Sequence, residues 1–257
     1  MAWFKQKYAF KQPALRLAHI TDCHLFSDTN GLYFEVNTAQ YLRRVLSQLA
    51  TEKLDGVIFG GDLTQDHTVA SYSLFARLIG ESSLTCPVFW MPGNHDEIEL
   101  LNQISNGQIH SAKHLYTEHV DILLLNSKGQ TPAGWCDEHH LACAKDVLNS
   151  SVKNALVFCH HHPVPIQGYL DKHMLENGPQ LLNMLVESDS VIALFHGHVH
   201  NDYHQHFRGL DIFATPATSI QFAKATAHWQ QQDLGPAWRL INIDGDTLAT
   251  EVIWLKG

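Results

Sequence analysis

The sequence lacks the features of membrane, secreted and nucleic-acid-binding proteins. It has no run of about 18 apolar residues, the minimum for a helix that crosses a bilayer. Residues 1–12 contain three lysines but no apolar segment, so they do not predict a secretory signal. The 17 Lys and Arg residues form no basic block, and the formal net charge is −9. We therefore expect a cytoplasmic protein with no membrane partner and no nucleic-acid partner.

Cysteine is scarce, and its spacing predicts no disulfide framework. There are five cysteines, an odd number, and none of them forms a CxxC pair. This pattern argues against both a disulfide scaffold and a zinc site built from thiolates. We expect Cys86, Cys136, Cys143 and Cys159 to be small core residues of a protein in a reducing compartment.

Linkers, internal repeats and low-complexity segments are also missing, and 257 residues suffice for one large α/β domain. Short apolar runs predict buried parallel strands at residues 15–21, 56–59, 87–91, 155–159 and 191–195. Helical spacing of apolar residues predicts helices at 37–53, 68–80, 138–149 and 179–187, with another beginning near residue 96. We expect a single domain over residues 1–257, with its core at about 15–215 and a β-rich part at about 203–257.

Histidine, in contrast, is abundant, with 19 copies. Together with Asp and Asn it forms short clusters directly after the five predicted strands: Asp22-Cys23-His24, Gly60-Gly61-Asp62, Gly93-Asn94-His95-Asp96, His160-His161-His162 and Gly197-His198-Val199-His200. In open α/β sheets, functional residues collect beyond the carboxyl ends of the strands. The five clusters are therefore expected to converge on one site.

The side chains in these clusters are ligands for hard or borderline metal ions. Asp, His and Asn without thiolate favour Mn, Fe or Zn. In an extended segment, residues two apart point the same way, so Asp22 and His24 are expected to form one pair of ligands and His198 and His200 another. Cys23 is then expected to point away from the metal.

A two-metal site explains the remaining cluster residues. Asp62 is the natural bridge, since a carboxylate can share its oxygens between two cations, and Asn94 offers a neutral oxygen. Two cations about 3.5–4 Å apart would lower the pKa of a bridging water and hold a phosphoryl group. The acidic chain does not exclude a phosphate-bearing substrate, because the cations supply positive charge locally.

His95 is expected to act on the substrate rather than on a metal. It adjoins Asn94 and could stabilise the transition state or protonate the leaving oxygen, with Asp96 or Asp66 orienting it. We expect His161 and His162 to be supporting or loop residues. Three tryptophans are expected to pack in the protein rather than to stack on a base: Trp135, Trp229 and Trp238.

The combined motifs resemble those of the calcineurin-like metallophosphoesterases. The resemblance covers residues 17–200 and rests on Asp22-x-His24, Gly61-Asp62, Gly93-Asn94-His95-Asp96, His160 and Gly197-His198-x-His200. A closer resemblance, to the bacterial class III 3′,5′-cyclic AMP phosphodiesterases, extends it almost end to end. It rests on residues 61–66, 91–96, 160–165, 170–171, 214–216, 221–222 and 235–239. Two features depart from that pattern: Cys23, and residues 224–233, which fit it loosely.

The resemblance implies a fold, two cofactor ions and a set of residue roles. The fold would be a four-layer α/β/β/α sandwich of two mixed sheets flanked by helices. The ions would be divalent, Fe and Mn first, with Zn or Mg as alternatives. One ion would be held by Asp22, His24, Asp62 and His200, and the other by Asp62, Asn94, His160 and His198. His161 is the alternative to His160. His95 would be catalytic, and the substrate would contact His24, Asn94, His95 and His200.

The expected activity is hydrolysis of 3′,5′-cyclic AMP to 5′-AMP by a metal-bridging hydroxide, and the expected partner is this small cyclic nucleotide. The residues alone indicate a phosphoester hydrolase, and the cyclic substrate comes from the resemblance. Alternatives are a broad-specificity or glycerophosphodiester phosphodiesterase and a non-catalytic scaffold with the same fold. No Arg adjoins a cluster, which disfavours a phosphomonoesterase that would grip a dianion. The sequence predicts no oligomeric state.

Overall fold

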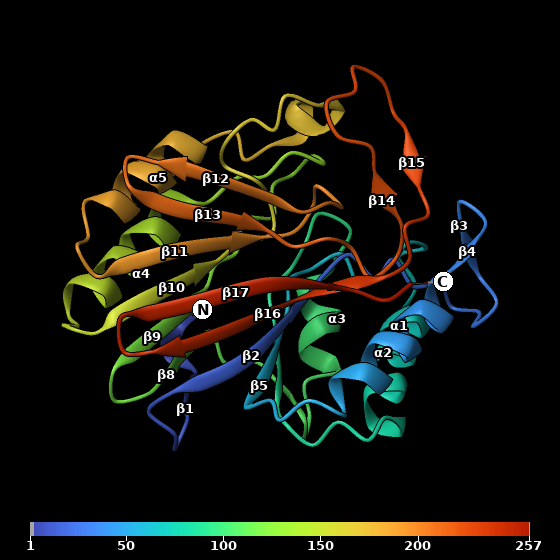
Figure 1. Ribbon diagram of the computed structural model, residues 1–257, viewed down its shortest axis with the longest axis horizontal. Coiled ribbons are helices and arrows are strands. Elements are labelled where there is room, and N and C mark those ends of the chain that lie inside the picture. The colour runs from blue at the N-terminus through green and yellow to red at the C-terminus, as the bar shows by residue number, and fades with distance from the viewer. Residues whose placement is uncertain (1–2, 257) are drawn as a thin grey trace.

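The computed structural model describes residues 3–256, which form two β-sheets packed face to face with helices outside (Figure 1). The first sheet has the spatial order β17 (Thr247–Trp254), β16 (Ala237–Asp244), β2 (Leu15–Ile20), β5 (Gly56–Phe59), β6 (Val88–Trp90) and β7 (Ile109–His110). The second has the order β1 (Lys7–Ala9), β8 (His114–Tyr116), β9 (Val120–Leu124), β10 (Asn154–Phe158), β11 (Val191–His196), β13 (Leu210–Ala214) and β12 (Tyr203–Phe207).

The strands that precede the histidine and aspartate clusters run parallel within each sheet. In the first sheet, β2 pairs with β5 and β5 with β6, all in parallel. In the second, β10 lies between β9 and β11 and is parallel to both. Antiparallel neighbours complete the sheets, with β16 against β2 and β12 against β13. Both sheets are therefore mixed, and the carboxyl ends of their parallel strands carry the clusters.

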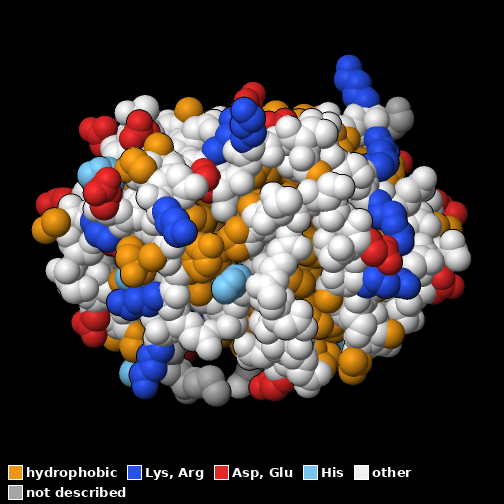
Figure 2. All heavy atoms as spheres, turned by 90° about the horizontal axis from the view of Figure 1, so that it is seen from below, with side chains coloured by type: hydrophobic (Ala, Val, Ile, Leu, Met, Phe, Trp, Pro, Cys, Tyr) orange, Lys and Arg blue, Asp and Glu red, His pale blue; other side chains and the backbone are white. Residues whose placement is uncertain are grey.

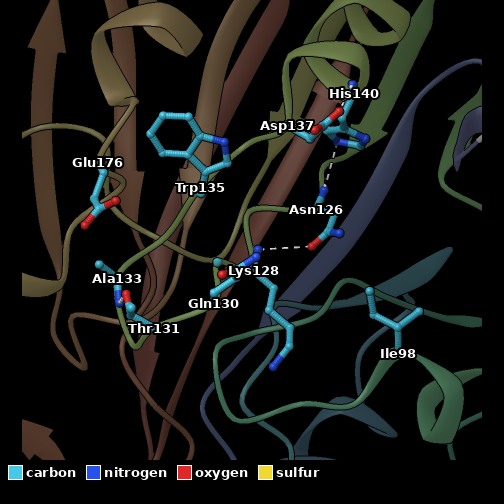
Figure 3. A pocket seen from close by; sticks show the side chains of 11 residues that line it. Ile98, Asn126, Lys128, Gln130, Thr131, Ala133, Trp135, Asp137, His140 and Glu176 are labelled. Carbon is cyan, nitrogen blue, oxygen red and sulfur yellow. Dashed lines mark hydrogen bonds between the residues drawn. The ribbon is translucent and has the colours of Figure 1, made fainter.

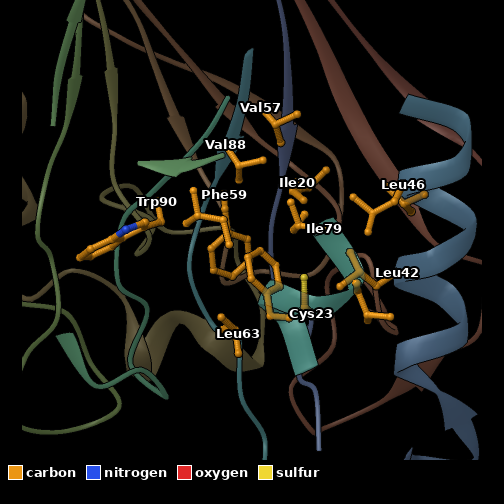
Figure 4. Close-up of a cluster of buried hydrophobic side chains, with 14 of the residues drawn as sticks. Ile20, Cys23, Leu42, Leu46, Val57, Phe59, Leu63, Ile79, Val88 and Trp90 are labelled. Carbon is orange, nitrogen blue, oxygen red and sulfur yellow. The ribbon is translucent and has the colours of Figure 1, made fainter. Parts of the chain in front are cut away.

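Three helices cover the outer face of the first sheet: α1 (Thr38–Leu49), α2 (Val69–Glu81) and α3 (Ile98–Gln103). Helix α1 buries Leu42, Val45, Leu46 and Leu49, the apolar stripe expected from their spacing. It begins at Asn37, whose side chain accepts a hydrogen bond from the Gln40 N–H. Cys23 lies in the same core cluster, between the sheet and the helices (Figure 4).

The second sheet is covered by α4 (Glu138–Asn149) and α5 (Gly178–Val186), which share a core cluster with β10. A third cluster fills the space between the sheets, where Leu17, Ile58 and Phe89 meet Leu156 and Phe195. These apolar layers give the order helix, sheet, sheet, helix. The four-layer α/β/β/α expectation is confirmed.

Several short elements were not predicted from the sequence. They are the 3-10 helices η1 (Trp3–Lys5) and η2 (Tyr169–His173), strands β1, β7 and β8, and two hairpins, β3 (Leu32–Tyr33) with β4 (Val36–Asn37) and β14 (Gln221–Phe222) with β15 (Gln231–Gln232). The hairpin of β16 and β17 lies in the expected β-rich part, but its pairing with β2 was not predicted, because pairing partners leave no local signal. Lys and Arg side chains are spread over both ends of the face shown in Figure 2, among acidic ones.

Candidate metal centre

The five clusters meet at one edge of the two sheets. Asp22 and Asp62 follow β2 and β5 of the first sheet, whereas His160 and His198 follow β10 and β11 of the second. Nε2 of His160 lies 3.3 Å from Oδ2 of Asp62 and 4.0 Å from Oδ1 of Asp22. The edge between the sheets therefore brings carboxylates and imidazoles from distant parts of the chain together.

Their ligand atoms form overlapping groups, each spanning less than 4.8 Å. One group contains Asp22, His24 and His200, with 3.2 Å between Nε2 of His200 and Oδ1 of Asp22. Others contain Asp22, Asp62 and His160; His24, Asp62 and His95; and His160, His161 and His198. Asp22 and Asp62 each belong to two groups, so each carboxylate lies where two cations could share it.

The backbone at these positions is not extended, so the expected strand geometry was wrong, although Asp22 and His24 do share a ligand group as expected. Strand β2 ends at Ile20, and both Asp22 (φ 56°) and His24 (φ 45°) are left-handed. The same holds for His198 (φ 66°) and His200 (φ 46°), which fall into different ligand groups. Non-glycine residues in this region are strained and persist only where the surroundings hold them.

Hydrogen bonds between the loops hold this strained backbone. The N–H groups of Asp22 and His24 donate to the carbonyls of Gly61 and Asp62, at 2.9 and 3.0 Å. The N–H of His198 donates to Oδ2 of Asp22 at 3.1 Å. The loops of both sheets thus fix one another, and tight turns rather than strand alternation aim the side chains.

Three histidines direct Nε2 toward the centre. Their Nδ1 atoms donate hydrogen bonds to oxygen: His24 to Gln65 Oε1 at 2.9 Å, His160 to Gly60 O at 2.8 Å and His200 to Ile220 O at 2.8 Å. A neutral imidazole that donates from Nδ1 carries a lone pair on Nε2, which is the form that binds metals. Nε2 of His24 and Nε2 of His200 face each other at 3.1 Å, and a cation would relieve this repulsion.

Buried polar atoms without partners also fit a pair of cations. Within residues 3–256, no hydrogen-bond partner is found for Oδ1 of Asp22, Oδ1 of Asn94, Nε2 of His160 or Nε2 of His198. Leaving each such atom buried and unpaired costs about 1–3 kcal/mol. All four are acceptors or can be, as metal ligands must be. The donor set therefore fits divalent cations of the Mn, Fe or Zn type.

The charges in this cluster depend strongly on one another. Burial raises the pKa of Asp22, but the neighbouring imidazoles of His200 and His160 together lower it to about 2. Burial lowers the pKa of His160, but the carboxylates of Asp62 and Asp22 and the Gly60 carbonyl together raise it to about 9. In both cases the charged carboxylate is the stable form. A cation would take the place of the imidazole proton.

His161 and His162 are buried rather than exposed on a loop. His161 contributes to the group with His160 and His198, and its Nδ1 lies 2.9 Å from Ser127 Oγ. His162 Nε2 lies 3.4 Å from Asp171 Oδ1. His160 is the residue of the triplet that shares a ligand group with both aspartates, as its position directly after β10 predicts.

His95 lies at the mouth of the centre. Its backbone N–H donates to Oδ1 of Asp62 at 2.9 Å, and its ring stacks on the His67 ring, with 5.2 Å between centroids. Burial lowers the pKa of His95, and the Asp62 charge only partly opposes this. Neither acid expected to orient the ring does so. Asp96 accepts from the N–H groups of Leu63 and Gly93, and Asp66 accepts from Ser27 and Thr68.

A cavity of about 610 Å³ lies between helix α3 and the loop that follows β9, and Ile98, Asn126 and Trp135 are among the residues that line it (Figure 3). Lys128 lines it, and its Nζ donates to the Asn94 carbonyl at 3.1 Å. Trp135 also lines it and is 44% exposed, so this tryptophan is packed only in part. Lys128, Ser127 and His67 carry no motif in the sequence, since only the fold places them beside the clusters.

The fold and this site define a class of protein. The calcineurin-like phosphoesterase pattern matches residues 15–202, and the chain belongs to that family. A probable cyclic nucleotide phosphodiesterase from Pseudoalteromonas sp. (strain SM9913) is 58% identical over 260 residues, covering 100% of both chains. The 3′,5′-cyclic adenosine monophosphate phosphodiesterase of Escherichia coli (strain K12) is 32% identical, covering 93% of this chain and 89% of the relative.

Solved structures share the fold at low sequence identity. A dimetal phosphatase from Danio rerio aligns with a TM-score of 0.67 and 14% identity, over 93% of this chain and 99% of that one. GAP50, the anchor in the inner membrane complex of Plasmodium, aligns with a TM-score of 0.66 and 12% identity, over 94% and 84%. Among residues 3–256, no helix has the length and apolar character to cross a membrane.

Proposed function

We propose that this chain hydrolyses 3′,5′-cyclic AMP to 5′-AMP, with a water molecule activated as hydroxide between two divalent cations. The observation that carries the proposal is the set of buried, unpartnered ligand atoms around Asp62. Family membership and the names of the two relatives support the reaction type and the substrate. The Arg239 guanidinium, held by Asp202 at 2.5 Å, is not free to grip a phosphomonoester.

We assign the ligands as the motifs suggest. Asp22, His24, Asp62 and His200 would hold one ion, and Asp62, Asn94, His160 and His198 the other. Fe and Mn are the proposed occupants, with Zn or Mg as alternatives. When bound, two cations lower the pKa of a water molecule and neutralise charge on phosphoryl oxygens.

Residues of the chain would then orient the substrate and protonate the leaving oxygen. In the reaction water adds to phosphorus, the bond from phosphorus to O3′ breaks, and O3′ leaves with a proton as the 3′-hydroxyl. His95 is placed at the mouth to hydrogen-bond the leaving oxygen, and its stacking on His67 limits rotation of its ring. Asn94, His24 and His200 lie around the same mouth and complete the proposed substrate contacts.

The test compares substrates on one enzyme. Mn- or Fe-loaded protein is assayed with 3′,5′-cyclic AMP, 2′,3′-cyclic AMP, a glycerophosphodiester and bis(p-nitrophenyl) phosphate. The proposal expects 3′,5′-cyclic AMP to have the highest kcat/KM, and His95→Ala to abolish most of the turnover. If 3′,5′-cyclic AMP is the slowest of the panel, the assigned substrate is wrong. If no diester is hydrolysed, the chain is a scaffold with the family fold.

A further inference from the structure

A circuit of aromatic rings joins two histidines of the metal centre to the surface. Starting at His24, each ring contacts the next: Tyr33 (4.7 Å between centroids), Phe34 (4.8 Å), Trp229 (5.4 Å), Phe222 (4.3 Å) and His200 (4.1 Å). His200 and His24 close the circuit at 4.9 Å. We call Tyr33, Phe34, Phe222 and Trp229 the aromatic rim. Two ligand histidines thus form the inner wall of an aromatic surface.

The aromatic rim is built by two hairpins that are separate from the main sheets. Tyr33 and Phe34 belong to the β3–β4 hairpin, and Phe222 and Trp229 to the β14–β15 hairpin, which lie on the same side of the molecule (Figure 1). Tyr33 stacks on His24 with 22° between ring planes, and Phe222 stacks on His200 with 11°. The inner rings are therefore fixed against the ligands, whereas Phe34 is 43% exposed.

The turn that carries Phe34 is strained. In the β3–β4 hairpin Tyr33 pairs with Val36, so Phe34 and Glu35 form a two-residue loop, and both have positive φ, 46° and 66°. Such turns favour Asn and Gly, because a bulky side chain with positive φ is strained. The turn itself does not require an aromatic residue at position 34, and a largely exposed ring adds little to the stability of the fold. Strain of this kind is characteristic of functional sites.

We propose that the nucleobase of the substrate stacks on the exposed ring of Phe34, which Trp229 supports. This inference rests on the proposed function, since it takes a nucleotide phosphate to sit at the metal centre. Two ring contacts, of 4.7 and 4.8 Å between centroids, join His24 to Phe34, and in a nucleotide one sugar joins the phosphate to the base. Stacking accepts any base because every base has a π-face, so adenine and guanine are bound alike.

The cavity lined by Lys128 and Trp135 is the competing location for the base. Its Lys128 donates a hydrogen bond to the Asn94 carbonyl, and its tryptophan, Trp135, is as exposed as Phe34. Among the described residues, no series of ring contacts joins this cavity to the ligand histidines. None of the residues that line it has the positive φ that marks strain at Phe34. The aromatic rim is therefore the better supported of the two, and Trp135→Ala separates them.

The test uses Phe34→Asn, because Asn is favoured at positive φ and this variant should fold at least as stably as the parent. KM and kcat are measured with 3′,5′-cyclic AMP and with deoxyribose 3′,5′-cyclic phosphate, which has no base. We expect a rise in KM of about ten-fold for cyclic AMP with little change in kcat, and no change for the base-free diester. Leu32→Ala, 52% exposed on the same hairpin, is the matched control and should change neither value.

A binding measurement keeps this test independent of turnover. Trp fluorescence is followed as 5′-AMP or ribose 5-phosphate is added to the metal-loaded protein. We expect quenching by 5′-AMP, weaker binding of 5′-AMP by Phe34→Asn, and equal binding of ribose 5-phosphate by both proteins. Trp229→Phe should retain the affinity but lose part of the quenching.

The outcomes separate the inference from the proposed function. If Phe34→Asn affects nucleotides and base-free ligands equally, or if only Trp135→Ala weakens nucleotide binding, the stacking site is refuted while the diesterase activity stands. If the metal-loaded protein hydrolyses neither cyclic phosphate, the proposed function fails. The 5′-AMP titration then still decides whether Phe34 binds a base.

Discussion

Replacing Gly93 by Ala should disable the metal centre by displacing both the carboxylate and the backbone of Asp62. A Cβ at residue 93 would lie 2.1 Å from Oδ1 of Asp62 and 2.4 Å from the Asp62 nitrogen. Ordinary contact begins at 3.4 Å, so the carboxylate would have to move by the difference, about 1.3 Å. Metal–ligand distances tolerate only about 0.2 Å. We expect kcat to fall by at least about 100-fold, the usual cost of a displacement of about 1 Å at a reacting centre.

The assay measures bound metal per chain by elemental analysis together with cyclic AMP turnover. Gly93→Ala should lose metal as well as activity, whereas Gly80→Ala is the matched control. A Cβ at Gly80, in helix α2, meets no atom within 4 Å, so this variant should gain about 0.5–1 kcal/mol of stability and keep full activity. Gly93→Ala with two bound ions and near-normal kcat would refute the assignment of Asp62 as the shared ligand.

Three further predictions concern the catalytic residue, a buried lysine and the ions. His95→Ala should lower kcat by about 10²–10⁴-fold with unchanged metal content; loss of metal instead would make His95 a ligand. Burial lowers the pKa of Lys113 well below 10.5 in the folded protein. Between that lowered pKa and pH 10.5 the unfolded chain binds more protons than the folded one, so stability rises with pH up to about 10.5. In urea titrations Lys113→Met should flatten this pH dependence and raise the free energy of unfolding by about 1 kcal/mol at pH 7. A lower free energy of unfolding would mean that the contact of Nζ with the Trp90 ring, 3.1 Å from its centroid, outweighs the cost of burial. Chelation should lower Tm in calorimetry by about 5–10 °C relative to protein with ions at 100-fold Kd, and an unchanged Tm would contradict coupling of the ions to folding.

The sequence predicted the meeting of the five clusters because two simple regularities apply to it. Apolar runs of four to six residues bounded by Gly or Pro mark buried parallel strands, and residues after such strands share one edge of a sheet. The spacing of Leu42, Val45, Leu46 and Leu49 likewise predicted helix α1 and its buried face. These signals are local, so they can be read without the fold.

The conformation of the ligand segments could not be predicted in the same way. Asp22, His24, His198 and His200 have positive φ, which residue type alone does not indicate. The hydrogen bonds that hold Asp22, His24 and His198 come from neighbouring loops, and the bond from His198 to Asp22 crosses between the two sheets. The aromatic rim also escaped prediction, since Phe34 and Trp229 are far apart in the chain. Trp229 was expected to pack in the protein, and the fold places its ring against Phe34 and Phe222. Trp238 is fully buried, as expected.

The central claim is that Asp62 lies between two cations at the edge where the sheets meet. Anomalous diffraction from crystals grown with Mn²⁺ tests it most directly. We predict two peaks about 3.5–4 Å apart, both adjoining the Asp62 carboxylate. A single peak, no peak, or density only at the exposed trio of His204, His206 and Asp211 would contradict the claim.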